Sequence, residues 1–354
     1  MRGCKLTLNE NALLHNLEVS KAHAPNARVV AMVKANAYGH GLINVATILD
    51  AHVDYFGVAC LSEGIQLREA GCQSNILLME GFFNEDELAD IRSHRLSIVL
   101  HEKWQVEALL RATGEKKIDV WLKHDSGMHR LGFSTDGFNQ ALKPLSRCDW
   151  VADDIKLMTH FACADSLPEV TKQHEIFKHV TGIHPFFSLS TANSAAILSF
   201  PDSHYQYIRP GIMLYGSSPL VGKSANAIGL QSVMTFSSKI IALRNCKPGD
   251  SVGYGADWQA VKPTTIATVA AGYGDGYPRH ITPEAFVVID GISCPIIGRI
   301  SMDMLNVDVS SLSNVHIEQD VILWGDELPI DTVASFSNTI SYDLLCRMGL
   351  QAHR

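Results

Sequence analysis

The sequence predicts an α/β protein in which an N-terminal (β/α)8 barrel of the TIM type is followed by a mostly β domain. In the first ~220 residues, short apolar runs alternate with amphipathic helical stretches, which is the pattern of successive βα units. Beyond about Leu220 the helical periodicity fades, and short β-rich runs separated by turn residues replace it. We therefore expect two domains, residues 1–225 and 226–354.

Eight apolar runs are candidates for the strands of the barrel. They are Val29–Lys34, Tyr55–Ala59, Asn75–Met79, Leu96–Leu100, Ile118–Lys123, Ile155–His160, Phe186–Ser190 and Tyr205–Arg209. Eight strands with intervening helices in this length of chain fit a closed (β/α)8 barrel. A doubly wound open sheet is the alternative, but the turn after the first strand lacks the G-x-G-x-x-G pattern of that fold.

Helical patterns precede and separate these strands. One pattern runs from Asn9 to about His23, ahead of the first strand. In Ser62–Gly71, we expect Ser62 to cap the start of a helix and Gly71 to end it. Two further helices are expected at Glu85–His94 and Glu102–Thr113.

The sequence pattern of the C-terminal third predicts strands joined by tight turns. The β-rich runs are Val233–Leu243, Thr264–Ala270, Ala285–Ile289, Cys294–Ile297 and Val321–Leu323. Turn sequences such as Pro248-Gly249-Asp250 and Asp290-Gly291 separate them. The small residues of Gly222–Gly229 predict a linker between the two domains.

Composition excludes several classes of function. The formal net charge is −8, and no basic run is long enough to suggest a nucleic-acid partner or an anionic membrane surface. No apolar stretch approaches the ~18 residues of a membrane span, and no secretory signal is recognisable, so we expect a cytoplasmic protein. The eight cysteines form no CxxC pair and predict reduced thiols. His160 and Cys163 have no second ligand pair, so no metal is expected.

Lys34 is the first candidate for chemistry. It ends the first predicted strand and is followed by small residues and glycines, which let the backbone approach a ligand closely. A partly desolvated lysine amine can attack a carbonyl and form a Schiff base. The alternative is a surface lysine before a loop. A nucleotide P-loop is excluded because the lysine precedes the glycines.

Polar residues also end several other predicted strands. They are Lys123, His160, Ser190 and Arg209, in addition to Lys34. Because active sites of (β/α)8 barrels are built at the carboxyl ends of the strands, these side chains are expected to surround one site.

Seven motifs in order resemble those of alanine racemases, and the resemblance covers nearly the whole chain. They are VKANAYGHG (Val33–Gly41), LKHDSGMHRLGF (Leu122–Phe133), RPGIMLYG (Arg209–Gly216), VGYG (Val252–Gly255), GYGDGYPR (Gly272–Arg279), GRISMD (Gly298–Asp303) and NTISY (Asn338–Tyr342). The chain departs from the usual family residues at Ser126, Ser301, Met304 and Asp343.

The resemblance implies a pyridoxal 5'-phosphate (PLP) enzyme that interconverts L- and D-alanine, supplying or consuming D-alanine for cell-wall peptidoglycan. Racemisation removes a proton from the α-carbon and returns one to the opposite face, so two bases are needed. By resemblance these are Lys34, which also holds the cofactor, and Tyr254. From the residues alone, a packed tyrosine of the β domain would be the favoured interpretation of Tyr254.

The resemblance also implies the cofactor contacts. Arg209 matches the arginine that faces the pyridine nitrogen, although spacing alone would also allow a salt-bridged barrel arginine. The other implied cofactor residues are Tyr38, His160, Asn193, Ser194, Gly211, Ile212 and Tyr342. Asn193 and Ser194 could instead be a plain helix cap.

Arg130 and Met302 resemble residues that bind the substrate, and Lys123 resembles a lysine that carries a carbamate and orients that arginine. The alternative for Lys123 is an unmodified lysine paired with an acid such as Asp125. The family further implies a homodimer in which Tyr254 and Met302 reach the site of the partner chain. Two other classes remain as alternatives: a fold-type III PLP amino acid decarboxylase, and a non-catalytic PLP carrier that has only the barrel.

Overall fold

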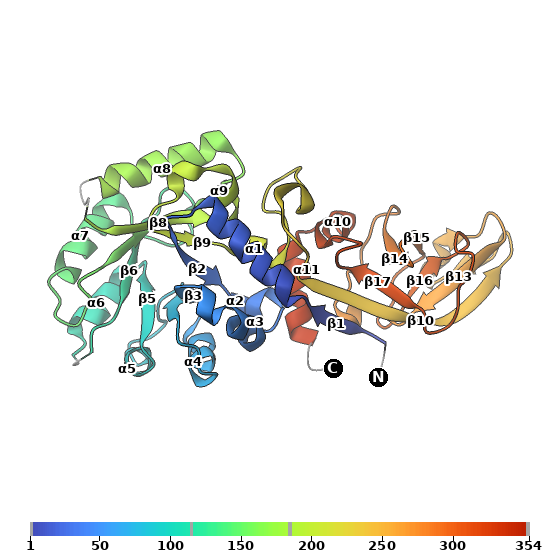
Figure 1. Ribbon diagram of the computed structural model, residues 1–354, viewed down its shortest axis with the longest axis horizontal. Helices are drawn as coiled ribbons and strands as arrows, with labels where there is room; N and C mark the ends of the chain where they lie inside the picture. Colours follow the sequence, from blue (N-terminus) through green and yellow to red (C-terminus); the bar gives the residue numbers. More distant parts are fainter. Residues whose placement is uncertain (1–2, 114–115, 183–185, 352–354) are drawn as a thin grey trace.

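The computed structural model describes residues 3–113, 116–182 and 186–351. Figure 1 shows an elongated molecule with a barrel and its helices at one end and a β-sheet at the other. Eight parallel strands form the closed barrel, so the (β/α)8 prediction is confirmed and the open sheet is wrong. The strands are β2 (Arg28–Met32), β3 (Tyr55–Val58), β4 (Asn75–Leu78), β5 (Leu96–Leu100), β6 (Val120–Lys123), β7 (Lys156–Met158), β8 (Ser188–Asn193) and β9 (Tyr207–Arg209). Pairing of β2 with β9, with Arg28 opposite Tyr207, closes the ring.

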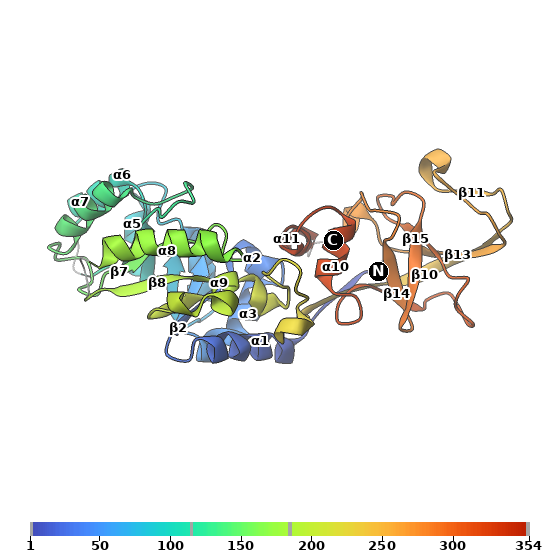
Figure 2. The ribbon, with the colours of Figure 1, turned by 90° about the horizontal axis from the view of Figure 1, so that it is seen from above.

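Helices cover the outside of the barrel (Figures 1 and 2). They are α1 (Glu10–His23), α3 (Leu42–Leu49), α4 (Leu61–Glu69), α5 (Glu87–Ser93), α6 (Lys103–Arg111), α7 (Thr135–Leu145), α8 (Leu167–Thr181) and α9 (Ser194–Ser199), with the short α2 (Lys34–Tyr38) after the first barrel strand. Asn9 caps α1 by accepting a hydrogen bond from the backbone N–H of Ala12 at 3.0 Å.

The expected cap at Ser62 is wrong. Helix α4 begins at Leu61, so Ser62 lies inside it and makes no capping bond. The backbone N–H of Ala59, ahead of the helix, instead donates to the Glu63 side chain at 2.8 Å. Glu63 therefore bonds the chain ahead of α4, and no side chain of the described residues caps the free N–H groups of its first turn.

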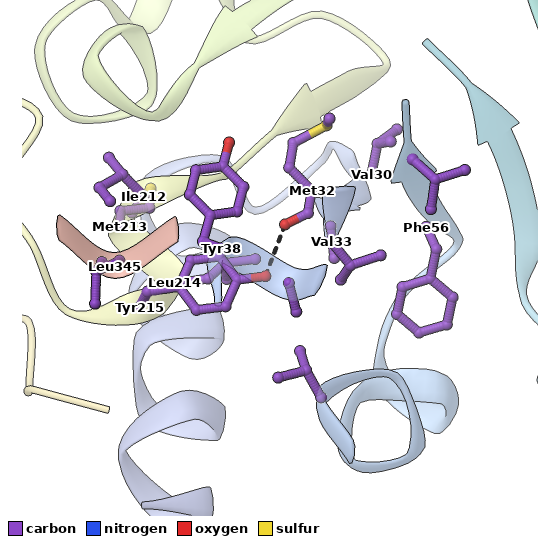
Figure 3. Close-up of a cluster of buried hydrophobic side chains, with 14 of the residues drawn as sticks. Val30, Met32, Val33, Tyr38, Phe56, Ile212, Met213, Leu214, Tyr215 and Leu345 are labelled. Atoms are coloured by element: carbon purple, nitrogen blue, oxygen red, sulfur yellow. Dashed lines mark hydrogen bonds between the residues drawn. The ribbon is translucent and has the colours of Figure 1, made fainter. Parts of the chain in front are cut away.

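Apolar side chains fill the barrel and continue into the C-terminal region. Figure 3 shows part of this core, where Tyr38 and Tyr215 lie between Met32 and Val33 on one side and Leu345 on the other. The hydroxyl of Tyr215 donates to the carbonyl of Met32 at 2.8 Å (Figure 3). This bond gives the buried phenol a hydrogen-bond partner.

The C-terminal sheet has seven strands in the order β1-β10-β13-β16-β15-β14-β17. They are β1 (Lys5–Leu8), β10 (Met234–Cys246), β13 (Thr264–Val269), β14 (Phe286–Ile289), β15 (Ile292–Ile297), β16 (Leu305–Asp308) and β17 (Asp320–Trp324). A separate hairpin joins β11 (Ser251–Val252) to β12 (Trp258–Gln259), and the helices α10 (Ile330–Phe336) and α11 (Ser341–Gln351) follow the sheet. The expected linker contains one 3-10 turn, Asn226–Ile228.

Both ends of the chain cross between the two regions. Strand β1 pairs with β10, with Lys5 opposite Ser237, so the chain begins in the C-terminal sheet and not in the barrel. Helix α11 returns to the barrel and packs on α2, where a Cβ on Gly39 would lie 1.9 Å from the carbonyl oxygen of Leu345. We retain residue 225 as a proposed boundary, with the first strand as an exception.

Among the residues that the structure describes, no helix has both the length and the apolar character needed to cross a membrane. The same residues include no group of three or more His, Cys, Asp or Glu side chains placed to hold a metal ion.

Candidate active site

A cavity of about 890 Å³ lies at the carboxyl ends of the barrel strands. Of the site residues predicted from the sequence, all but Ser190, Tyr254 and Met302 line it. Those that line it are Lys34, Tyr38, Lys123, Arg130, His160, Asn193, Ser194, Arg209, Gly211, Ile212 and Tyr342. Four of them carry cationic groups, and the described acidic residues of the lining are Glu80 and Asp165. Such a cavity suits an anionic ligand.

Lys34 opens a turn of left-handed helix. Ala35, Asn36, Ala37 and Tyr38 all have φ between +51° and +54°, and none of them is glycine. A left-handed conformation costs roughly 1–2 kcal/mol per L-residue, so other contacts must stabilise this turn. The turn presents Lys34, Ala35 and Tyr38 to the cavity from consecutive positions.

Arg209 is fixed by hydrogen bonds inside the barrel. Its Nη1 donates to the Oγ of Ser190 at 2.6 Å, and its Nη2 donates to the carbonyls of Thr159 and Thr191 at 2.7 and 3.1 Å. Its buried Nε atom has no hydrogen-bond partner. Burial lowers the pKa of Arg209 to about 10, so the guanidinium remains charged at neutral pH.

His160 lies next to this guanidinium, with Nδ1 3.5 Å from Nη2 of Arg209. Burial, followed by the charges of Arg209, Lys123 and Arg130, holds the pKa of His160 well below its usual range. The imidazole is therefore neutral and can accept from the guanidinium.

Lys123 is buried at the end of β6 with 5% of its surface exposed. Burial, followed by the charges of Arg209 and Arg130, lowers the pKa of Lys123 to about 8. The Asp125 carboxylate accepts hydrogen bonds from the backbone N–H groups of Gly127 and His129 and contacts the His129 ring. No ion pair joins Lys123 to Asp125 within the described ranges.

Hydroxyl and backbone groups gather at the β8 and β9 side of the cavity. The Oγ of Ser194 accepts from the backbone N–H of Gly211 at 2.8 Å. Asn193 caps α9 by accepting from the N–H of Ala196 at 3.1 Å, and it also lines the cavity. Asn193 therefore caps α9 and lines the cavity at the same time. Burial raises the pKa of the Tyr38 hydroxyl, which keeps it protonated and able to donate.

Comparison with known proteins covers both regions of the chain. A family model described as the alanine racemase N-terminal domain matches residues 8–219, and one described as the alanine racemase C-terminal domain matches residues 233–354. The alanine racemase of Legionella pneumophila (strain Corby) is 44% identical over 98% of this chain and 98% of its own length.

The chain belongs to the alanine racemase family.

Solved structures agree with this assignment. The biosynthetic alanine racemase from Pseudomonas aeruginosa superposes with a TM-score of 0.94 at 42% identity, covering 98% of this chain and 97% of that one. The alanine racemase from Bartonella henselae, solved with covalently bound pyridoxal phosphate, has a TM-score of 0.88 at 28% identity, covering 98% and 97%. The family match includes the β domain, which the barrel-only carrier lacks.

Two residues that the family resemblance places in the active site lie outside the cavity of this racemase-family chain. Tyr254 is 71% exposed and Met302 is 52% exposed, and neither lines the cavity. Tyr254 follows β11, and Figure 2 shows this hairpin at the end of the molecule farthest from the barrel. A single chain therefore does not bring Tyr254 to Lys34.

The structure adds lining residues that sequence reasoning missed. They include Met32, Met79, Glu80, Leu131, Asp165, Ile340 and Cys346. Met79 and Glu80 directly follow β4, so the rule that polar strand ends form the site could have found Glu80. Cys346 reaches the cavity from α11, and no local pattern predicted that this helix returns to the barrel.

Proposed function

We propose that this chain interconverts L- and D-alanine with PLP as cofactor, with Lys34 and Tyr254 as the two bases. The observation that carries the proposal is the position of the Lys34 amine at a strand end, in a cation-rich cavity of an alanine racemase family member. We further propose that the D-alanine serves the peptidoglycan pool and that the protein works in the cytoplasm.

The chemistry of the lining groups fits PLP. The phosphate needs hydrogen-bond donors, and Tyr38, Ser194 and Tyr342 offer hydroxyls beside the backbone N–H of Ile212. The unpartnered Nε of Arg209 shows that this guanidinium has unused donor capacity. The solved Bartonella henselae racemase carries pyridoxal phosphate covalently, which supports the same cofactor here. When bound, PLP withdraws electrons from the α-carbon of the amino acid and so acidifies its hydrogen.

The two proposed bases act on opposite faces of the α-carbon. We assign the Nζ of Lys34 to the α-hydrogen of D-alanine and the hydroxyl oxygen of Tyr254 to that of L-alanine. When one group removes the α-hydrogen from its face, the other delivers its own proton to the opposite face, and this inverts the carbon. Arg130 and Met302 would bind the substrate, and the charged Arg209 would keep the ring nitrogen unprotonated because a guanidinium does not readily give up its proton.

Lys123 is proposed to carry a carbamate. Four observations support it: the amine is buried, its pKa is about 8, cations surround it and Asp125 is occupied elsewhere. A neutral amine attacks CO2, forms a C–N bond and releases a proton. The product is an anion, which would attract Arg130 where an ammonium would repel it.

The active unit is proposed to be a homodimer with shared sites. Support comes from the exposure of Tyr254 and Met302, neither of which lines the cavity of its own chain. A two-fold pairing that puts each β domain over the partner's barrel mouth would complete two sites at once. Tyr254 of the partner subunit would then act opposite Lys34.

Product analysis with labelled L-alanine tests the function. The purified holoenzyme should yield D-alanine, and Lys34→Ala should yield none. Release of an amine would instead identify a decarboxylase, and an unchanged substrate would identify a carrier. Either of these results would overturn the proposal.

A further inference from the structure

We infer that Glu63 and His40, which do not line the cavity, are positioning residues that hold the left-handed turn and so aim Lys34. The inference rests on the proposed role of Lys34 as the residue that holds the cofactor. Neither side chain is among the cavity lining.

Glu63 bridges two strand ends with its two carboxylate oxygens. Its Oε1 accepts from the backbone N–H of Ala35 at 2.8 Å, immediately after Lys34. Its Oε2 accepts from the N–H of Ala59, just beyond β3, at 2.8 Å. Because β2 and β3 are neighbours in the barrel, the carboxylate ties the backbone that carries Lys34 to the adjacent strand. Hydrogen bonds from a backbone N–H to a carboxylate are strong. The side-chain nitrogen of a glutamine in place of Glu63 could accept neither of these two bonds, because it is only a donor.

His40 holds the other end of the turn. Its Nδ1 lies 3.1 Å from the carbonyl oxygen of Ala37 and 3.0 Å from that of Tyr38. Because both neighbours are acceptors, Nδ1 carries the proton and donates to them. The ring is buried and packs on Tyr215 with centroids 4.5 Å apart, so it cannot move away without a loss of packing.

The turn needs both supports because its conformation is unfavourable for four consecutive L-residues. Glu63 fixes the first residue after Lys34, and His40 fixes the last two residues of the turn. Loss of either support lets the backbone relax toward ordinary dihedral angles and moves the Lys34 amine. A displacement of about 1 Å at a reacting group can cost about 100-fold in rate.

The first test compares Glu63→Gln with Glu69→Gln. Both residues lie on α4, and the Glu69 side chain is exposed and makes no hydrogen bond or ion pair within the described part of the chain. Glu63→Gln should lower kcat roughly 10- to 100-fold with KM for alanine within about twofold. It should lower the rate at which the apoenzyme captures PLP on Lys34, followed by absorbance, by a similar factor. Glu69→Gln should match the wild type in both rates.

The second test uses His40→Asn and His40→Leu. The amide nitrogen of asparagine occupies about the place of Nδ1 and can donate to both carbonyls, whereas leucine cannot. Capture of PLP should stay within about threefold of wild type for His40→Asn and fall at least tenfold for His40→Leu. Equal capture rates for the two variants would overturn the role of His40. This pair also decides the proposal if Glu63→Gln fails to fold.

The remaining outcomes are equally decisive. The inference fails for Glu63 if Glu63→Gln behaves as Glu69→Gln does, or if its defect lies in KM instead of kcat. Borohydride reduction of the wild-type holoenzyme and peptide mass spectrometry separate this failure from that of the proposed function. Cofactor on a peptide without Lys34 defeats the lysine assignment, whereas cofactor on Lys34 with unchanged rates in Glu63→Gln defeats only the positioning role.

Discussion

The hydroxyl oxygen of Tyr38 lies 2.7 Å from the position that a Cβ atom would occupy on Gly211. Tyr38 cannot easily swing away, because it belongs to the left-handed turn and its ring stacks on Tyr215 at a centroid distance of 4.8 Å. The close approach thus joins the end of β9 to the turn that follows β2, and it requires a residue without a side chain at position 211.

Gly211→Ala is therefore expected to weaken PLP binding about tenfold, because the new methyl group displaces the Tyr38 hydroxyl. Titration of the apoenzyme with PLP measures this. In a double-mutant cycle, Tyr38→Phe should reduce the effect of Gly211→Ala, since the clashing oxygen is gone. Strict additivity of the two changes would show that the methyl group acts elsewhere.

Tyr254→Phe should lower racemisation by about 100- to 10,000-fold while leaving the affinity for PLP within about twofold. Lys34 remains in place, so the α-hydrogen of D-alanine should still exchange with deuterated solvent, as NMR can follow. The α-hydrogen of L-alanine should not exchange. Racemisation near the wild-type rate in this variant would mean that another residue is the second base.

Carbamylation of Lys123 should depend on pH in a defined way. Only the neutral amine reacts with CO2, and a pKa of about 8 makes the neutral fraction rise tenfold per pH unit up to about pH 8 and then level off. At a fixed CO2 pressure, the initial rate at which the ¹³C carbamate signal appears in NMR should follow this curve. An ordinary lysine would level off only above its reference pKa of about 10.4.

Lys156 offers a matched control for this measurement. It is also buried, and burial alone would lower its pKa, but Asp119, 2.8 Å from its Nζ, and Asp154, 3.2 Å away, together leave the pKa raised. Lys156→Arg should leave the carbamate signal intact, and Lys123→Ala should remove it. A signal that survives Lys123→Ala would refute the assignment.

Shared sites predict complementation between inactive chains. Lys34→Ala and Tyr254→Phe homodimers should both be inactive in racemisation. A heterodimer should contain one site with both lesions and one intact site, so subunit exchange should restore up to about half of the wild-type activity per heterodimer. Exchange is verified by differently tagged chains. No recovery after verified exchange would exclude Tyr254 of the partner subunit as the second base.

Acid stability should depend on His40. Burial lowers its pKa to about 4, so between pH 6.5 and 4 the unfolded chain binds a proton that the native ring does not. Stability therefore falls as the pH falls through this window, by about 3 kcal/mol from this residue. Urea unfolding should show this loss in wild type and its absence in His40→Asn. Parallel pH profiles for the two proteins would count against a buried, neutral His40.

Much of the barrel could be predicted because its signals are local. Apolar β-branched runs such as Arg28–Met32 form buried parallel strands wherever they pair, and the side chains at their ends reach one rim. Arg209, Lys123 and Lys34 were found by that rule and line the cavity.

The sequence alone does not reveal features that depend on distant partners. The segment after Lys34 contains no glycine until Gly39, so nothing local predicts a left-handed turn; Glu63 and His40 stabilise it. Strand β1 was missed because its order comes from pairing with β10, more than 200 residues away. The exposed position of Tyr254 likewise follows from the arrangement of the two regions and not from its own motif.

The contacts that β1 and α11 make with distant parts of the chain can form only in a set order during synthesis. All eight barrel strands have been made once Arg209 is added, but Leu345 of α11, which packs against Gly39 beside the lysine turn, follows only after every strand of the C-terminal sheet. The N-terminal β1 likewise waits for β10. A nascent barrel on the ribosome thus lacks part of the support for Lys34, and chains that terminate before α11 lack Tyr342 as well. If Lys34 holds the cofactor as proposed, firm capture of the cofactor is expected only after that helix has been translated.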